Sequence, residues 1–186
     1  NEVDVAMSIL LQRTNDIVLM QCNTNYTASL GNFKYINLNV LKEYSRKYPD
    51  CVLGLSDHTP GHATVLGAVA LGARVIEKHF TNNTNREGPD HKFSMDFNSW
   101  RDMVNRTREL ENALGSSTKR VEFNEKETVI LQRRSIRTKK DLVIGDRIHE
   151  NDIEFLRPCP EGALPPYELE KILNTELAED IKSGDY

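Results

Sequence analysis

Two histidines in this 186-residue sequence follow short apolar segments, and both are potential metal ligands. His58 comes after the segment 52–55, and His79 comes after the segment 73–77. Neutral imidazole binds divalent metals through either ring nitrogen. Two such ligands leave a coordination shell incomplete, so water or substrate oxygens must complete it. The alternative to a metal site is that both histidines are ordinary polar residues at strand ends, and spacing alone does not decide between the two.

Alternation along the two segments decides which polar side chains share a face with the histidines. In an extended chain, residues two positions apart point the same way. Ser56 therefore lies on the face of the first histidine, and Glu77 lies on the face of the second. A carboxylate in this place suits general acid–base catalysis. The alternative is that Glu77 pairs with Lys78 or Arg74, although alternation points both of those side chains away from it.

A polar loop follows the second histidine and is long for a strand-to-helix connection. It runs from Thr81 to His91 and contains Gly88-Pro89-Asp90, which predicts a tight turn. Asp90 has two interpretations. It accepts a hydrogen bond from a substrate hydroxyl, or it is an ordinary turn residue.

The elements that must position these residues alternate between helix and strand. Helices are predicted at 3–11, 33–48, 60–71 and 99–114, the last with Ser99 and Asp102 at capping-box spacing, and buried strands at 17–20, 52–55 and 73–77. Such alternation indicates a parallel sheet, and parallel sheets bind ligands at the carboxyl ends of their strands. Both histidines are expected at that edge. A doubly wound sheet and a β/α barrel both satisfy the pattern.

The pattern changes after Gly115. The segment 116–132 is polar and charged, as in an interdomain linker. Short β-like pieces follow it, and the segment 141–146 resembles the segment 180–185. Two half-units of this kind predict a small pseudo-symmetric β domain over 133–186.

Composition narrows the class of protein. With 24 Lys and Arg against 28 Asp and Glu, the net charge is −4, and no basic cluster indicates nucleic acid or an anionic membrane surface. No apolar run approaches the roughly 20 residues of a membrane span. Three widely spaced cysteines exclude a disulfide framework and favour a reducing cytoplasm. Because no initiator methionine or signal peptide opens the sequence, we expect a fragment of a longer protein.

Three blocks of the sequence, in their order and spacing, resemble the sialic acid synthase family. They are Gly54–Thr59, Ile76–Thr81 and Gly88–His91. The end of the chain, which includes Phe155-Leu156-Arg157-Pro158, resembles the small SAF (antifreeze-like) domain with which this family typically ends. The resemblance therefore extends over essentially the whole chain.

The resemblance implies an α/β fold with two domains. Residues 1–115 correspond to the C-terminal part of a TIM-type (β/α)8 barrel, 116–132 to a linker and 133–186 to the SAF domain. Three of the eight barrel strands are then present. We expect such a piece to be inactive by itself.

The family condenses phosphoenolpyruvate with an N-acyl hexosamine to a nine-carbon 2-keto acid and releases phosphate. The sugar is N-acetylmannosamine or a diacetamido-trideoxyhexose, and the segment 21–26 is similar to the legionaminic acid branch. The resemblance implies a divalent metal, Mn²⁺ or Mg²⁺. Two other readings stay open: a carbohydrate- or partner-binding fragment with no activity of its own, and an unrelated metal-dependent aldolase.

The resemblance also implies a role for individual residues: metal binding for His58 and His79, proton transfer for Glu77, phosphate contacts for Ser56 and Thr24, sugar contacts for Tyr26 and Asp90, and an N-acyl contact for Arg157. The last of these comes from the small domain of a partner subunit, so the resemblance implies a domain-swapped homodimer. The alternative for Arg157 is a surface ion pair with Glu154 or Glu161.

Overall fold

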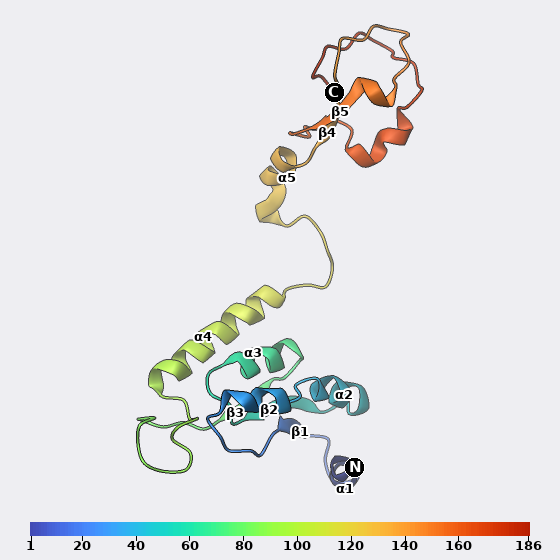
Figure 1. Cartoon of the computed structure of the whole chain (residues 1–186). Coiled ribbons are helices and arrows are strands. Elements are labelled where there is room, and N and C mark those ends of the chain that lie inside the picture. Colours follow the sequence, from blue (N-terminus) through green and yellow to red (C-terminus); the bar gives the residue numbers. More distant parts are fainter. The chain divides into compact units, whose positions relative to one another are not determined.

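The computed structural model describes all residues from 1 to 186, and the chain divides into two compact units (Figure 1). The first unit comprises residues 1–116 and the second comprises residues 117–186. No helix in either unit combines the length and the apolar character that crossing a membrane requires.

The first unit is a parallel three-stranded sheet covered by helices. Its strands, in the spatial order β1-β2-β3, are β1 (Val18–Cys22), β2 (Val52–Asp57) and β3 (Val75–Lys78). Its helices are α1 (Glu2–Leu10), α2 (Val40–Lys47), α3 (Ala63–Ala70) and α4 (Phe97–Leu114), with a 3-10 helix, η1, at Leu30–Tyr35. The predicted alternation of helix with parallel strand is confirmed, and α3 packs against α4 (Figure 1).

The core of this unit lies between the sheet and the helices. One cluster of buried side chains joins α2, β2 and the region of α3; its members are Leu41, Leu53, Leu55, Ala68 and Ala73. Full burial of one leucine side chain stabilises the fold by about 1.5–3 kcal/mol. Because the leucines of β2 point toward the helices, the alternate residues of β2 point to the opposite face.

The predicted helix over 33–48 is wrong. The chain instead forms η1, and after a break it forms α2. The break contains Asn37, whose φ of 51° lies in the left-handed region. Asparagine tolerates this conformation better than most residues because its short polar side chain can hydrogen-bond locally. The apolar spacing that predicted one helix is therefore divided between two short ones.

One smaller expectation also needs correction. The capping box of α4 uses Asp96 and Ser99, because the Asp96 carboxylate accepts from the Ser99 N–H at 2.8 Å and Ser99 Oγ accepts from the Asp96 N–H at 2.9 Å. The predicted pair of Ser99 and Asp102 does not form it. The helix predicted at 3–11 forms as α1, which ends at Leu10 and has Met7 as its one buried residue.

The second unit is small and has little regular structure. It contains η2 (Phe123–Glu125), α5 (Lys126–Gln132), β4 (Ser135–Thr138), η3 (Glu150–Asp152), β5 (Ile153–Leu156) and η4 (Pro166–Lys171). Strands β4 and β5 pair antiparallel. The segment 116–132, predicted as a linker, is thus partly helical.

The internal repeat of the second unit corresponds to a physical pairing. Leu142 and Ile181, at equivalent positions of the two copies, exchange backbone hydrogen bonds of 3.0 Å each. Gly145 and Gly184 have φ values of 88° and 86°, a conformation that glycine adopts without strain. The two copies therefore form matching turns.

Candidate functional site

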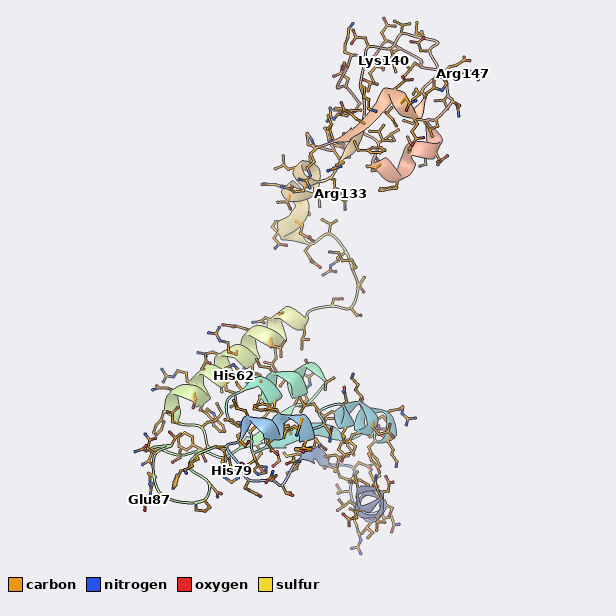
Figure 2. The ribbon with its side chains drawn as sticks, viewed as in Figure 1. His62, His79, Glu87, Arg133, Lys140 and Arg147 are labelled. Carbon is orange, nitrogen blue, oxygen red and sulfur yellow. The ribbon has the colours of Figure 1, made fainter.

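The two histidines lie level with each other at the carboxyl ends of β2 and β3. His58 directly follows Asp57 and His79 directly follows Lys78, and these two preceding residues are partners in the parallel register. The imidazole centroids are 5.1 Å apart with an interplanar angle of 60°. Figure 2 shows His79 at this end of the sheet. The structure thus brings together the pair that strand spacing placed at one edge.

Two other rings complete a cluster around the histidines. The Tyr26 ring lies 4.2 Å from the His58 ring, measured between centroids, and the Phe93 ring lies 5.0 Å from the His79 ring. Phe93 is 3% exposed, whereas Tyr26 is 54% exposed. Sequence reasoning missed Phe93, and the one available signal was an apolar residue shortly after the polar loop. The ring cluster is therefore buried on the side of Phe93 and open to solvent on the side of Tyr26.

The tautomer of His58 follows from its backbone partner. Its Nδ1 lies 2.9 Å from the carbonyl oxygen of Asn23, in the loop after β1. Because a carbonyl only accepts, Nδ1 carries a proton, and in the neutral ring Nε2 then keeps the lone pair. A backbone carbonyl that orients an imidazole in this way is a common arrangement for a metal-ligating histidine. Asn23 is a second residue that sequence reasoning missed.

The loop after β3 brings Asp90 to the other histidine. Asp90 Oδ2 lies 3.7 Å from Nδ1 of His79. The loop is fixed behind it, because Ser94 Oγ donates to the Asp90 carbonyl at 2.6 Å and the Thr81 hydroxyl hydrogen-bonds His91 Nδ1 at 2.7 Å. Asp90 is therefore held beside the ring cluster. This position is compatible with binding a substrate hydroxyl and with an ordinary turn residue.

Glycine is required in that same loop. Gly88 has a φ of 149°, and a Cβ atom there would lie 2.9 Å from the His91 ring. Any side chain at Gly88 would displace His91 and loosen the turn before Asp90.

Glu77 is paired with a hydroxyl. Ser56 Oγ donates to Glu77 Oε1 at 2.7 Å, across the register that pairs these two residues. Lys78 pairs instead with Asp57 on the opposite face. The suggested ion pair of Glu77 with Lys78 is therefore wrong, and the assignment of faces by alternation is confirmed. Glu77 is exposed, so its carboxylate is available to a ligand.

Two further candidates and one other histidine lie elsewhere in the chain. Thr24 is exposed in the loop that also carries Tyr26. Arg157 belongs to the second unit, directly after β5, where it is exposed and has no ion pair with either of the two glutamates suggested for it. His62, which Figure 2 labels, stands at the start of α3, where its side chain makes no capping hydrogen bond. Its Nδ1 lies 3.5 Å from Oδ2 of Asp102.

The donor set fits a divalent metal that keeps open coordination positions. No group of three or more His, Cys, Asp or Glu side chains in the chain is arranged so that it could hold a metal ion. The two histidines therefore supply two imidazole ligands at most, with His58 already in the tautomer that exposes Nε2. Open positions are what a catalytic metal needs in order to bind substrate oxygens.

Comparison with protein families divides the chain at nearly the same place as its structure does. Residues 1–119 match the model of the NeuB family, and residues 133–186 match that of the SAF domain.

Two of the individual proteins to which the chain is similar are named as acid synthases. The chain is 36% identical over 168 residues to N,N'-diacetyllegionaminic acid synthase of Legionella pneumophila, covering 90% of this chain and 46% of the relative. It is 34% identical over 177 residues to pseudaminic acid synthase of Campylobacter jejuni, covering 94% of this chain and 49% of the relative. The chain thus spans about half the length of the curated relatives it matches.

Solved structures show a similar fold. The crystal structure of an N-acetylneuraminic acid (sialic acid) synthetase from Leptospira borgpetersenii, in complex with citrate, aligns with a TM-score of 0.60 and 28% identity. The alignment covers 69% of this chain and 44% of that one.

Proposed function

This chain belongs to the NeuB family, and from that premise we propose that it carries part of the active site of a nonulosonic acid synthase. The reaction joins the three carbons of phosphoenolpyruvate to the six carbons of an N-acyl hexosamine, consumes one water molecule and releases phosphate. Relatives named as legionaminic and pseudaminic acid synthases support this class of product. A diacetamido-trideoxyhexose is the sugar that they favour over N-acetylmannosamine.

The three parallel strands belong, in this proposal, to a (β/α)8 barrel, and the second unit is an SAF domain. Two observations support the barrel: each strand is followed by helix, and the polar candidates gather at the carboxyl ends of the strands. In barrel enzymes the active site lies at that end.

His58 and His79 hold the metal in this proposal. Their ring separation and the fixed tautomer of His58 support the assignment. When bound, the ion would act as a Lewis acid toward an oxygen of the open-chain sugar aldehyde. Imidazole ligands favour Mn²⁺ over Mg²⁺, because Mg²⁺ prefers oxygen ligands.

Glu77 moves a proton at the reacting carbon, and Ser56 orients its carboxylate. Ser56 has a single hydroxyl proton, and the 2.7 Å hydrogen bond to Glu77 uses it. A contact between Ser56 and the phosphate would therefore require Ser56 to rotate away from Glu77. Binding of phosphoenolpyruvate would then free one Glu77 oxygen at the moment at which the reaction needs it.

Three other side chains bind the substrates. Tyr26 contacts the sugar through its exposed ring, which already lies against the ring of His58. Asp90 accepts from a sugar hydroxyl while the loop contacts of Ser94 and His91 hold it in place. Thr24 donates its hydroxyl to the phosphate.

Arg157 binds the N-acyl carbonyl from the SAF domain of a partner subunit in a homodimer. Its exposure and its lack of an acidic partner support this role, since the guanidinium is free to donate.

The three cysteines are unpaired, which suits a reducing compartment, and we place the protein in the cytoplasm.

The observation that carries the proposal is the convergence of His58, His79 and the Ser56–Glu77 pair at one end of one sheet. Incubation of the full-length protein with Mn²⁺, phosphoenolpyruvate and an N-acyl hexosamine tests it by phosphate release and by the mass of the 2-keto acid. Phosphate release that requires both the metal and the sugar is the expected result. Sugar binding without turnover would instead identify a carbohydrate-binding protein.

A further inference from the structure

We propose that the buried ion pair of Asp57 and Lys78 is a positioning device that sets the separation of the His58 and His79 rings. This inference rests on the proposed function, which makes those two rings a metal site. Asp57 and Lys78 do not themselves touch the site, because they occupy the opposite face of their strands.

The pair is completely removed from solvent. The side chain of Asp57 is 0% exposed, that of Lys78 is 1% exposed, and Nζ lies 2.5 Å from Oδ2. Desolvation of two charges costs several kcal/mol per ion. The geometry must therefore be favourable for both charges to persist.

Every charge in this pair is met by further hydrogen bonds. Asp57 Oδ1 accepts from the backbone N–H of Thr59 at 3.1 Å and from its hydroxyl at 2.9 Å, and Oδ2 also accepts from Thr64 Oγ1 at 2.6 Å. Lys78 Nζ donates a second bond to the Thr59 carbonyl at 2.6 Å. The network connects the end of β2, the end of β3 and the first turn of α3.

The place of the pair in the register explains what it controls. Asp57 immediately precedes His58, Lys78 immediately precedes His79, and the two are partners in the parallel ladder. A bond between them holds the last paired positions of β2 and β3 together, one residue before each ligand. If it loosens, the two strands can separate at their ends, and the rings move apart with them.

Stability alone does not account for such a pair. Buried ion pairs often contribute no more to stability than apolar side chains of similar volume, and their best-attested use is to specify register. The pair stands where register determines ring separation.

The decisive variant is the neutral double substitution Asp57→Asn with Lys78→Gln in the full-length protein. It leaves no unpaired buried charge and shortens only the lysine side chain, so we expect the protein to fold, as circular dichroism will show. Mn²⁺ affinity, measured by titration calorimetry, should fall by about tenfold or more. Wild-type affinity in the folded double variant would overturn the proposal.

A milder pair of variants keeps the test decisive if the double variant does not fold. Thr64→Val removes one hydrogen bond to Asp57, and Thr64→Ser retains it. Weaker Mn²⁺ binding in the valine variant, with recovery in the serine variant, supports a positioning role. Equal binding by both variants and the wild type contradicts it.

A surface ion pair of the same chemistry provides the matched control. Lys47 and Asp4 also join two elements of the first unit, but both are partly exposed and remote from the histidines in sequence. The double substitution Asp4→Asn with Lys47→Gln should leave Mn²⁺ affinity unchanged. A loss equal to that of the buried pair would show that the effect is general loosening and not positioning.

A metal-free measurement separates this inference from the proposed function. The NMR cross-peak between the His58 and His79 rings reports their separation with no metal present. Its loss in the double variant supports positioning even if the wild type fails to bind Mn²⁺, which would reject only the metal site. Its persistence at full intensity in the double variant overturns the inference.

Discussion

The hydroxyl of Ser56 donates a 2.7 Å hydrogen bond to the carboxylate of Glu77, from one strand to its parallel neighbour. The two residues are direct partners in the register, so the sheet itself holds their side chains together. One residue beyond this pair along each strand is the buried ion pair, and one residue further are the two histidines. Adjacent positions thus alternate between the face of the sheet that carries the candidate site and the face that packs against the helices.

Replacement of Glu77 by glutamine should separate proton transfer from metal binding. The side chain keeps its size and its hydrogen bond with Ser56, but it can no longer take up a proton. We expect kcat to fall by about 10²–10⁴-fold, the range for general acid–base residues. Mn²⁺ affinity should change little. Glu87→Gln, in the loop after β3 (Figure 2), is the control and should retain full activity. Full activity of Glu77→Gln would exclude the assigned role.

Sharing of sites between subunits predicts complementation. Arg157→Ala and His58→Ala should each inactivate the full-length protein. After subunit exchange, mixed dimers contain one intact site of two, so activity should return to about a quarter of the wild type. Mixing wild type with the Arg157→Ala, His58→Ala double variant sets the reference for exchange. Failure to recover activity, once exchange has been demonstrated, would mean that each subunit completes its own site.

The 186-residue chain by itself should associate and show no turnover. Strands β1 and β3 each have one unpaired edge, and Val18 and Val52 of the sheet are 45% and 43% exposed. Open sheet edges, together with exposed apolar side chains on the sheet, promote association between molecules. Light scattering on a size-exclusion column measures the mass. A monomer of 21.2 kDa with synthase activity would be incompatible with this prediction.

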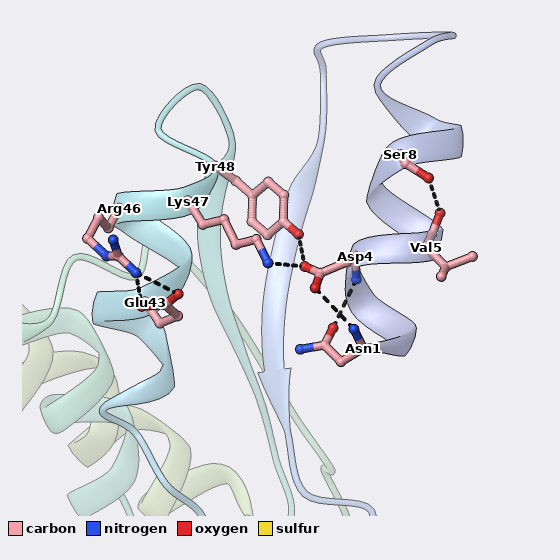
Figure 3. A network of polar contacts seen from close by, with 8 residues as sticks. All are labelled: Asn1, Asp4, Val5, Ser8, Glu43, Arg46, Lys47 and Tyr48. Atoms are coloured by element: carbon pink, nitrogen blue, oxygen red, sulfur yellow. Dashed lines mark hydrogen bonds and ion pairs between the residues drawn. The ribbon is translucent and has the colours of Figure 1, made fainter.

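The contact between α1 and α2 should depend on pH. Hydrogen bonds to Asp4 from Lys47 and, second, from Tyr48 hold the pKa of the Asp4 carboxyl well below its ordinary value of 3.8 (Figure 3). A depressed pKa contributes stability above the unfolded pKa, and this contribution is lost as pH falls toward the folded one. The stability difference between wild type and Asp4→Asn should therefore be constant from pH 7 to about 4 and shrink below that.

Urea unfolding of the full-length protein at a series of pH values measures this difference. Glu43→Gln is a suitable control because it removes the exposed Glu43–Arg46 pair, which lies within α2 and connects no other element (Figure 3). An Asp4→Asn effect that stays constant down to pH 2 would contradict the assigned pKa direction.

Local periodicity predicted the part of the site that lies on strands. Alternation placed Ser56 and Glu77 on one face, and the structure pairs them. It could not predict Phe93 or the Asn23 carbonyl, because both reach the histidines from loops whose paths depend on tertiary packing. Asn37 is a similar case, since one left-handed residue interrupts a spacing that otherwise indicates a continuous helix.

The ion pair of Asp57 and Lys78 could not be predicted from the sequence for a different reason. The sequence places both residues on the helix-facing side of the sheet, where a charge is unfavourable without a partner. Which partner each would find depends on the register of β2 against β3, and register is a property of the folded sheet. Spacing alone does not determine it.

Binding of Mn²⁺ to the full-length protein tests the central claim, that His58 and His79 together form a metal site. Electron paramagnetic resonance of free Mn²⁺ during a titration gives the number and affinity of sites. The wild type should bind one ion per subunit, and His79→Ala should weaken this binding by at least about tenfold. His62→Ala, which removes an imidazole paired with Asp102 in the same unit, should bind as the wild type does. Equal binding by wild type and a His58→Ala, His79→Ala double variant that remains folded would contradict the account.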